Sequence, residues 1–158
     1  MKMSEHGREL LSQWEGIKEK AYVNADGNKT IGVGHILTTS EKSLGSISIN
    51  EERVDYSRGL TKKQIMGLLA QDLERLEKTI NEKVAAHLDQ NQFDALVSFS
   101  FNIGVEAFIG STLLKKLNAG LYDEIPDEMM KWTKSGGKTI LGLVNRRQHE
   151  INLWHETV

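Results

Sequence analysis

A break in the residue pattern between positions 22 and 49 constrains the fold of this chain more than any other feature. Before the break, residues 4–18 place apolar side chains on one face, which predicts a short amphipathic helix. Within it the sequence turns to Gly, Asn, Thr and Ser, and Asp26-Gly27 stands between two β-type runs. That dipeptide is typical of a tight turn. The pattern therefore predicts a helix followed by a β-hairpin.

The polar stretch at residues 51–59 is expected to form a loop. The pattern of the chain after it predicts helices. Thr61 opens the sequence TKKQ, a capping-box pattern, and a long helix is expected over about 61–82. Further elements are expected as a strand over Ser46–Ile49 and as helices from Gln90 to about Asn102 with Asp89 as the cap, from Ser111 or Thr112 to Asn118, around Pro126, and from Leu143 to Trp154.

This order of elements predicts an α+β fold in one domain of 158 residues, long enough to bury a core. A small β-hairpin lobe is expected at about 20–59. The long helix at about 61–82 connects it to a helical lobe, 83–158, which also takes the N-terminal helix.

Composition excludes several classes of site. The chain has 20 Lys and Arg against 22 Asp and Glu, so we expect no broad basic face for nucleic acid. It has no Cys, which excludes disulfides, thiolate metal sites and cysteine nucleophiles. The five His lack metal spacing, and the series Asn24, Asp26 and Asn28 lacks the Gly and Glu that complete a calcium loop. We therefore expect no metal and no cofactor.

The first residues, MKMSEHGRELLSQWEG, contain no apolar core of an export signal, and no window of the chain resembles a membrane span. A protein without its own export signal and without membrane insertion is expected.

One carboxyl group stands in a setting that suits acid chemistry. Glu15 lies near the end of the first helix beside Trp14, and Thr30 begins a strand of the expected hairpin. A protonated Glu and a held water are the parts needed to cleave a glycosidic bond. Most Glu side chains are exposed and structural, so position alone leaves both readings of Glu15 open.

The stretch EGIKEKAYVNADGNKTIGVGH, residues 15–35, resembles the active-site signature of phage-type lysozymes, glycoside hydrolase family 24. In that signature E-G and A-Y are followed by a carboxylate nine residues after the Glu and then by G-x-x-T-I-G-x-G-H. Segments that resemble the family in the same order continue to residue 147, namely LTKKQIMGLLAQDL, LDQNQFDALVSFSFNIG, STLLKKLNAG and GLVNRR. The resemblance covers essentially the whole chain.

The resemblance implies a lysozyme-like fold and a muramidase that hydrolyses the β-1,4 bond between N-acetylmuramic acid and N-acetylglucosamine. It implies that Glu15 is the acid, that Thr30 positions the water, and that Arg146 is the charge partner of the acid. It also supports a structural pair of His35 with Asp72 and a substrate-binding role for three residues, Phe101, Asn102 and Thr112.

The chain departs from the family pattern at Asn24, which stands where the family has Asp. An amide can orient a water but cannot act as a general base or stabilise a cation by charge. We therefore expect reduced or altered activity, with Asp26 two residues away as a source of some charge. A catalytically silent peptidoglycan-binding domain is the alternative, and hydrolase and lytic transglycosylase products both stay open.

As a family member the chain is expected to be a bacteriophage endolysin or a prophage relative, monomeric, with peptidoglycan glycan strands as its partner. Without an export segment it would stay in the host cytoplasm. It would then reach peptidoglycan in the periplasm only after a holin permeabilises the membrane.

Overall fold

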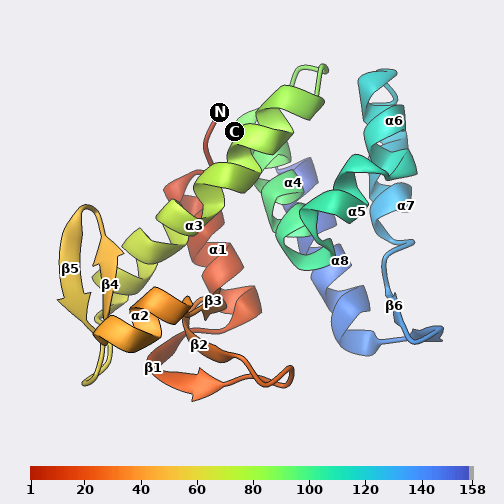
Figure 1. The fold of residues 1–158 in the computed structure, drawn as a ribbon. Helices are drawn as coiled ribbons and strands as arrows, with labels where there is room; N and C mark the ends of the chain where they lie inside the picture. Colours follow the sequence, from red (N-terminus) through yellow and green to blue (C-terminus); the bar gives the residue numbers. More distant parts are fainter. Residues whose placement is uncertain (157–158) are drawn as a thin grey trace. The chain divides into compact units, whose positions relative to one another are not determined.

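The computed structural model describes residues 1–156, and Figure 1 shows how their helices and strands follow one another. In chain order the elements are α1 (Glu5–Glu15), β1 (Lys18–Val23), β2 (Lys29–Gly32), β3 (His35–Ile36), α2 (Thr39–Leu44), β4 (Ser46–Ile49), β5 (Glu52–Asp55), α3 (Lys62–Lys83), α4 (Gln90–Ile103), α5 (Val105–Ile109), α6 (Thr112–Asn118), the 3-10 helix η1 (Tyr122–Glu124), α7 (Ile125–Met129), β6 (Lys134–Ser135), β7 (Lys138–Thr139) and α8 (Leu141–His155).

The chain divides into two compact units, and the division falls within α1 and within α3. The β-containing unit is Arg8–Glu74. The helical unit consists of Met1–Gly7 and the residues from Arg75 onward.

The β-containing unit is built on a three-stranded antiparallel sheet in the order β1-β2-β3, with β4 and β5 as a separate hairpin. Thr30 of the central strand lies opposite Tyr22 of β1 and opposite Ile36 of β3. The β4–β5 turn lies close to α3, because a Cβ on Gly67 would be 3.2 Å from the side chains of both Ile49 and Asn50. The fully buried apolar side chains of this unit include Leu11, Ile31, Ile47, Ile65 and Leu73.

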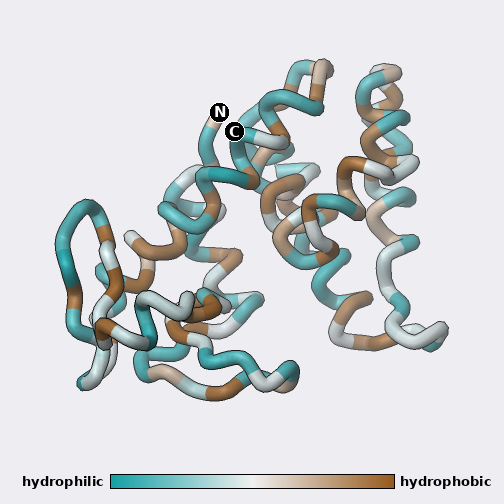
Figure 2. The backbone as a smooth tube through the Cα atoms, viewed as in Figure 1, coloured by the Kyte–Doolittle hydropathy of each residue, from teal (hydrophilic) through white to brown (hydrophobic). Residues whose placement is uncertain are grey.

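The helical unit is centred on α4, which packs against α8. Every residue of α4 from Phe93 to Ser100 is buried, and Figure 2 shows hydrophobic residues along α4 and α5. The helix starts at a capping box, in which the Asp89 side chain accepts from the Gln92 backbone and the Gln92 side chain accepts from the Asp89 backbone.

Three helix caps were predicted correctly from the sequence. Besides Asp89, the expected capping box at Thr61 is present, with Thr61 Oγ1 accepting from Gln64 N at 3.1 Å and Gln64 Oε1 accepting from Thr61 N at 2.9 Å. Of the two candidates for the start of α6, Ser111 is the N-cap.

Two expectations were wrong, and some elements were not foreseen. The first helix ends at Glu15 rather than at residue 18, because Gly16 takes a φ of +88° and its N–H closes the helix on the Ser12 carbonyl. The polar stretch 51–59 is not all loop, since β5 pairs with β4 over its whole length. Helix α2 was not foreseen; the Thr38–Glu41 capping box starts it, and none of its residues is buried.

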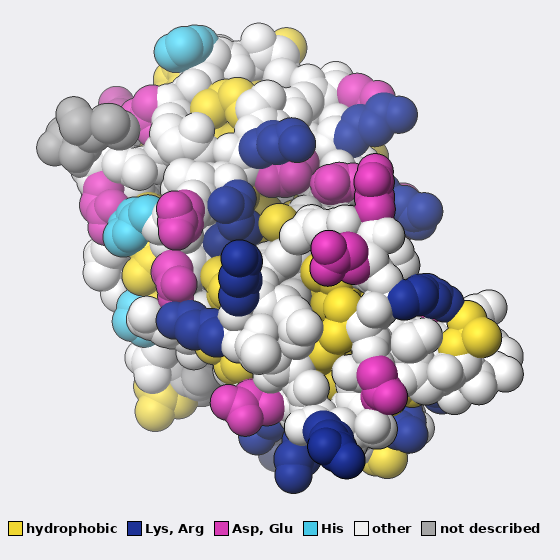
Figure 3. All heavy atoms as spheres, turned by 90° about the vertical axis from the view of Figure 1, so that its left-hand side faces the viewer, with side chains coloured by type: hydrophobic (Ala, Val, Ile, Leu, Met, Phe, Trp, Pro, Cys, Tyr) yellow, Lys and Arg dark blue, Asp and Glu magenta, His cyan; other side chains and the backbone are white. Residues whose placement is uncertain are grey.

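None of the helices within residues 1–156 combines the length and the apolarity that crossing a bilayer requires. On the face shown in Figure 3, basic and acidic side chains are interspersed rather than gathered into a patch of one sign.

Candidate active site

Glu15 is the last residue of α1 and belongs to the β-containing unit. Its side chain is half-buried. Because Gly16 adopts a left-handed conformation, the chain leaves the helix abruptly and enters β1 at Lys18. The carboxyl group is therefore carried at a fixed junction between a helix and a strand.

Asn24 organises the turn between β1 and β2. Its side-chain Oδ1 accepts from the backbone N–H groups of Asp26 at 3.0 Å and Asn28 at 2.9 Å. Its backbone N–H donates to the Asn28 carbonyl at 2.9 Å, and its carbonyl accepts from Gly27 N at 3.0 Å. A short side chain with an acceptor oxygen is what such a turn requires, and Asp would serve it as well as Asn.

Thr30 lies on β2, with its side chain buried at 2% exposure. Its hydroxyl donates to the Asn28 carbonyl at 3.0 Å. Because a hydroxyl has one proton and two lone pairs, this bond leaves the lone pairs of Thr30 Oγ1 as acceptors for a water. The same Asn28 backbone therefore holds both Asn24 and Thr30.

His35 lies between two carboxylates. Its Nδ1 is 2.8 Å from Asp72 Oδ2 on α3, the partner expected from the sequence, and its Nε2 is 2.9 Å from Glu41 Oε1 on α2. Burial by itself lowers the pKa of His35, but the hydrogen bonds and charges of Asp72 and Glu41 outweigh it and raise the pKa to about 9. The imidazolium thus joins β3 to both α2 and α3.

The other expected site residues lie in the helical unit. Arg146, on α8, is 8% exposed and its Nε donates to Glu150 Oε2 at 3.0 Å. Asn102, near the end of α4, is exposed and its Oδ1 accepts from Arg147. Phe101 beside it is half-buried, and Thr112 is exposed at the start of α6.

Sequence reasoning missed Glu41, Arg147 and Glu150 as partners of the expected residues. Each had a signal. Thr38 and Glu41 have the capping-box spacing, and Glu150 follows Arg146 and Arg147 by four and three residues, the spacing at which helical side chains meet.

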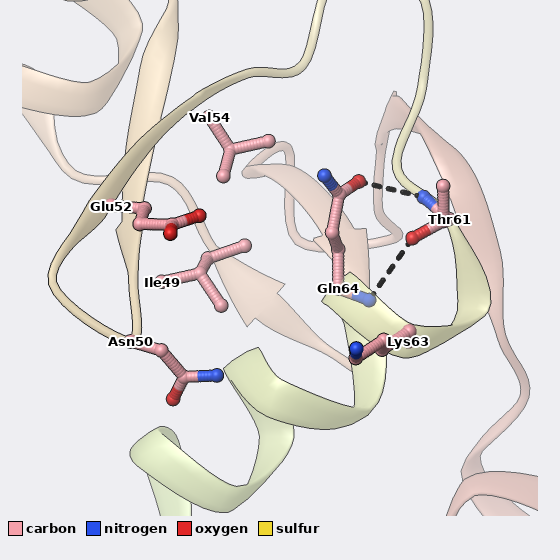
Figure 4. Close-up of a pocket in the computed structure, with 7 residues that line it drawn as sticks. All are labelled: Ile49, Asn50, Glu52, Val54, Thr61, Lys63 and Gln64. Atoms are coloured by element: carbon pink, nitrogen blue, oxygen red, sulfur yellow. Dashed lines mark hydrogen bonds between the residues drawn. The ribbon is translucent and has the colours of Figure 1, made fainter.

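A pocket of about 370 Å³ lies in the β-containing unit between the β4–β5 hairpin and the start of α3 (Figure 4). Ile49 and Val54 supply its apolar wall, while Thr61 and Gln64 are occupied with each other in the capping box. None of the residues that line it is an expected site residue. Within residues 1–156, no group of three His, Asp or Glu side chains is arranged to hold a metal ion.

The family model described as phage lysozyme matches residues 12–150 of this chain. An endolysin of Acyrthosiphon pisum secondary endosymbiont phage 1 is 38% identical over 158 residues, which cover 98% of each chain. An endolysin of Bacillus phage PZA is also 38% identical and covers 98% of this chain, but the match spans only 55% of that relative. Some other matching relatives are named SAR-endolysins.

Among solved structures, a mutant of P22 lysozyme matches with a TM-score of 0.83 and 35% identity, and the match covers 99% of both chains. The α+β, lysozyme-like fold expected from the sequence is therefore confirmed.

Proposed function

This chain belongs to the phage lysozyme family, whose members are lysozyme-type glycoside hydrolases, and we propose that it cleaves the β-1,4 bond between N-acetylmuramic acid and N-acetylglucosamine with Glu15 as the acid. In this proposal Thr30 positions the attacking water. Arg146 is the charge partner of the acid, and Phe101, Asn102 and Thr112 contact the glycan.

The observation that carries the proposal is the role of Asn28 in the β1–β2 hairpin. Its N–H donates to Asn24 Oδ1 at 2.9 Å, and its carbonyl accepts both the Asn24 N–H at 2.9 Å and the Thr30 hydroxyl at 3.0 Å. Position 24 and Thr30 are therefore fixed relative to each other by one residue. This is the preorganisation that a site for a positioned water needs.

The chemistry divides between two steps. Glu15 transfers its proton to the glycosidic oxygen as the bond to the anomeric carbon breaks. A water donates one hydrogen bond to Thr30 Oγ1 and presents its own lone pair to the anomeric carbon, since the Thr30 proton is already given to the Asn28 carbonyl. As the new C–O bond forms, this water releases its other proton to bulk water, because the Asn24 amide cannot accept it as a base.

Asn24 weakens this chemistry without disturbing the hairpin. The amide keeps both turn hydrogen bonds but brings no negative charge to the cation that develops at the sugar. Losing one electrostatic element of this kind costs on the order of 10²–10³ in rate. We therefore propose reduced activity for the chain as it stands.

The test compares this chain with its Asn24→Asp variant in the release of soluble muropeptides from purified peptidoglycan. A carboxylate accepts the same two backbone N–H groups, so the variant should melt at an unchanged or higher temperature and turn over about 10²–10³ times faster. Ala25→Asp adds the same charge to an exposed neighbouring position and is the matched control. An equal gain from both substitutions would show that charge alone, not position 24, matters.

The alternative is a catalytically silent peptidoglycan-binding domain, which the missing carboxylate at position 24 favours. Silence of both this chain and Asn24→Asp, with peptidoglycan binding retained, would support this alternative. The reducing ends of any products, free or anhydro, separate hydrolysis from transglycosylation.

We further propose that the chain acts as a monomer and reaches peptidoglycan only after the host membrane is permeabilised, as by a holin. Cells that express it alone should stay intact until chloroform is added. Spontaneous lysis would refute this route.

A further inference from the structure

A buried charge cluster in the helical unit contains three residues, Arg147, Glu150 and Ser98, that have no role in the chemistry proposed above. It consists of Arg146, Arg147 and Glu150 on α8, with Ser98 and Asn102 on α4. Arg147 and Glu150 are completely buried. Burying such charges costs free energy unless each has well-placed partners. The partners of these residues therefore show which side chains the cluster fixes in position.

Glu150 lies between the two guanidinium groups. Its Oε2 accepts from Arg146 Nε at 3.0 Å and from the Ser98 hydroxyl at 2.5 Å. Its Oε1 is 2.7 Å from Arg147 Nε, but off the direction of the N–H bond, so this contact is an ion pair and not a hydrogen bond. The carboxylate thus pairs with the Nε side of Arg147, and the two terminal nitrogens of Arg147 bond to other groups.

The far end of Arg147 is fixed by three further contacts. Nη1 donates to the Trp132 carbonyl at 3.3 Å, and Nη2 donates to Asn102 Oδ1. The guanidinium carbon lies 5.2 Å from the centroid of the Phe99 ring. Held in this way, the guanidinium presents one N–H group to Asn102 in a set direction.

This contact decides which way the Asn102 amide points. A guanidinium has only donors, so the amide must turn its oxygen to Arg147 and its NH₂ group away. Within residues 1–156 the Asn102 NH₂ group has no acceptor, and the side chain is exposed. The end of α4 therefore displays a pair of oriented N–H donors.

We propose that Arg147, paired with Glu150, is a positioning residue that orients Asn102 to donate to the N-acetyl carbonyl oxygen of a glycan. This inference rests on the proposed function, which supplies N-acetylated sugars as the substrate class. An acetamido group offers the acceptor that the amide needs, whereas the ammonium of a de-N-acetylated sugar offers only donors. The site thus selects for acetylated glycan.

The test measures the affinity for the β-1,4-linked tetramer of N-acetylglucosamine and for the corresponding tetramer of glucosamine. The unsubstituted chain should favour the acetylated sugar by about 5- to 10-fold, the effect of one hydrogen bond. Asn102→Asp keeps an acceptor for Arg147 but loses both donors, and its carboxylate accepts from an ammonium. It should therefore melt no lower and prefer the glucosamine tetramer.

Asn152→Asp is the matched control, because it makes the same charge change at an exposed position of α8 and keeps its acceptor for Gln148. Its ratio of the two affinities should equal that of the unsubstituted chain. Arg147→Lys retains the charge beside Glu150 but cannot present the same fork of donors, so the ratio should fall toward one.

An unchanged ratio in Asn102→Asp or in Arg147→Lys would overturn the inference, as would equal binding of the two sugars by the unsubstituted chain. Binding of neither sugar would overturn it as well. Peptidoglycan cleavage by the same preparations would still support the proposed function in each case, so the two can fail separately.

Discussion

The imidazolium of His35 should make the stability of this protein depend on pH in a defined window. His35 is held by Asp72 at 2.8 Å and by Glu41 at 2.9 Å, and its side chain is only 13% exposed. We consider the substitution His35→Gln, which removes the titrating group and its positive charge.

The size of the effect follows from the pKa. Folding raises the pKa of His35 from 6.5 to about 9, and each pH unit in between is worth about 1.36 kcal/mol, or about 3 kcal/mol in all. Because the folded-state pKa is the higher one, this stabilisation is complete below pH 6.5 and is lost as the pH rises through 9. For a chain of this size it corresponds to roughly 6–12 °C in melting temperature.

The assay is thermal or urea unfolding of both proteins at pH 6 and pH 10, which avoids the acid range where Glu41 begins to titrate. Burial raises the pKa of Glu41, but its hydrogen bonds to Thr38 and His35 outweigh this and lower it, so its contribution is lost only as the pH falls below about 4.5. The stability gap between the unsubstituted chain and His35→Gln should shrink by about 3 kcal/mol from pH 6 to pH 10. His87→Gln, at an exposed position, is the control. A gap that is the same at both pH values would refute the reasoning.

Three further outcomes are expected. Gly7→Ala should destabilise the protein by about 1–3 kcal/mol in urea unfolding, because its Cβ would lie 2.6 Å from the buried Asp94 carboxylate. The control Gly142→Ala, in open space on a helix, should be neutral or stabilise the protein by up to about 1 kcal/mol. Equal effects of the two substitutions would refute the clash at Gly7. Glu51→Gly should raise stability by about 0.5–1 kcal/mol, since Glu51 has a φ of +69° in a two-residue turn that favours Gly there; a lower melting temperature would contradict this. Thr30→Ala should slow muropeptide release without abolishing it, since water still enters but loses its acceptor, and unchanged turnover would remove Thr30 from the site.

The sequence predicted the starts of α3, α4 and α6, because each of these helices begins at a local capping motif. Capping boxes at Thr61 and Asp89 and the N-cap at Ser111 involve residues three positions apart, so they can be identified without knowing the fold. The hairpin turn at Asp26-Gly27 belongs to the same class.

Two of the elements that were missed, β5 and α2, lack a hydrophobic face. Strand β5 reads Glu-Arg-Val-Asp, and of its side chains only Val54 is even partly buried, so no alternation shows it. Helix α2 buries none of its residues and depends on its caps, the Thr38–Glu41 box and Gly45 at a φ of +68°. Such elements are decided by pairing and caps rather than by burial.

The candidate site was likewise predictable only in part. The resemblance supplied the residue types at positions 15, 24 and 30, but not the hydrogen bonds of Asn24 and Thr30 to Asn28, which depend on the conformation of the turn. The orientation of Asn102 could not be predicted either, because the Arg147 that sets it lies 45 residues away in the sequence.

The central claim is that Glu15 is the acid. It is tested most directly by the release of reducing ends from purified peptidoglycan by Asn24→Asp protein, with and without Glu15→Gln. An amide has no acidic proton for the leaving oxygen, so we predict that Glu15→Gln abolishes turnover, with melting temperature and glycan binding little changed. Glu19→Gln, at an exposed position of β1, should retain full activity. If Glu15→Gln kept most of the turnover, Glu15 would not be the acid, and the proposed active site would be wrong.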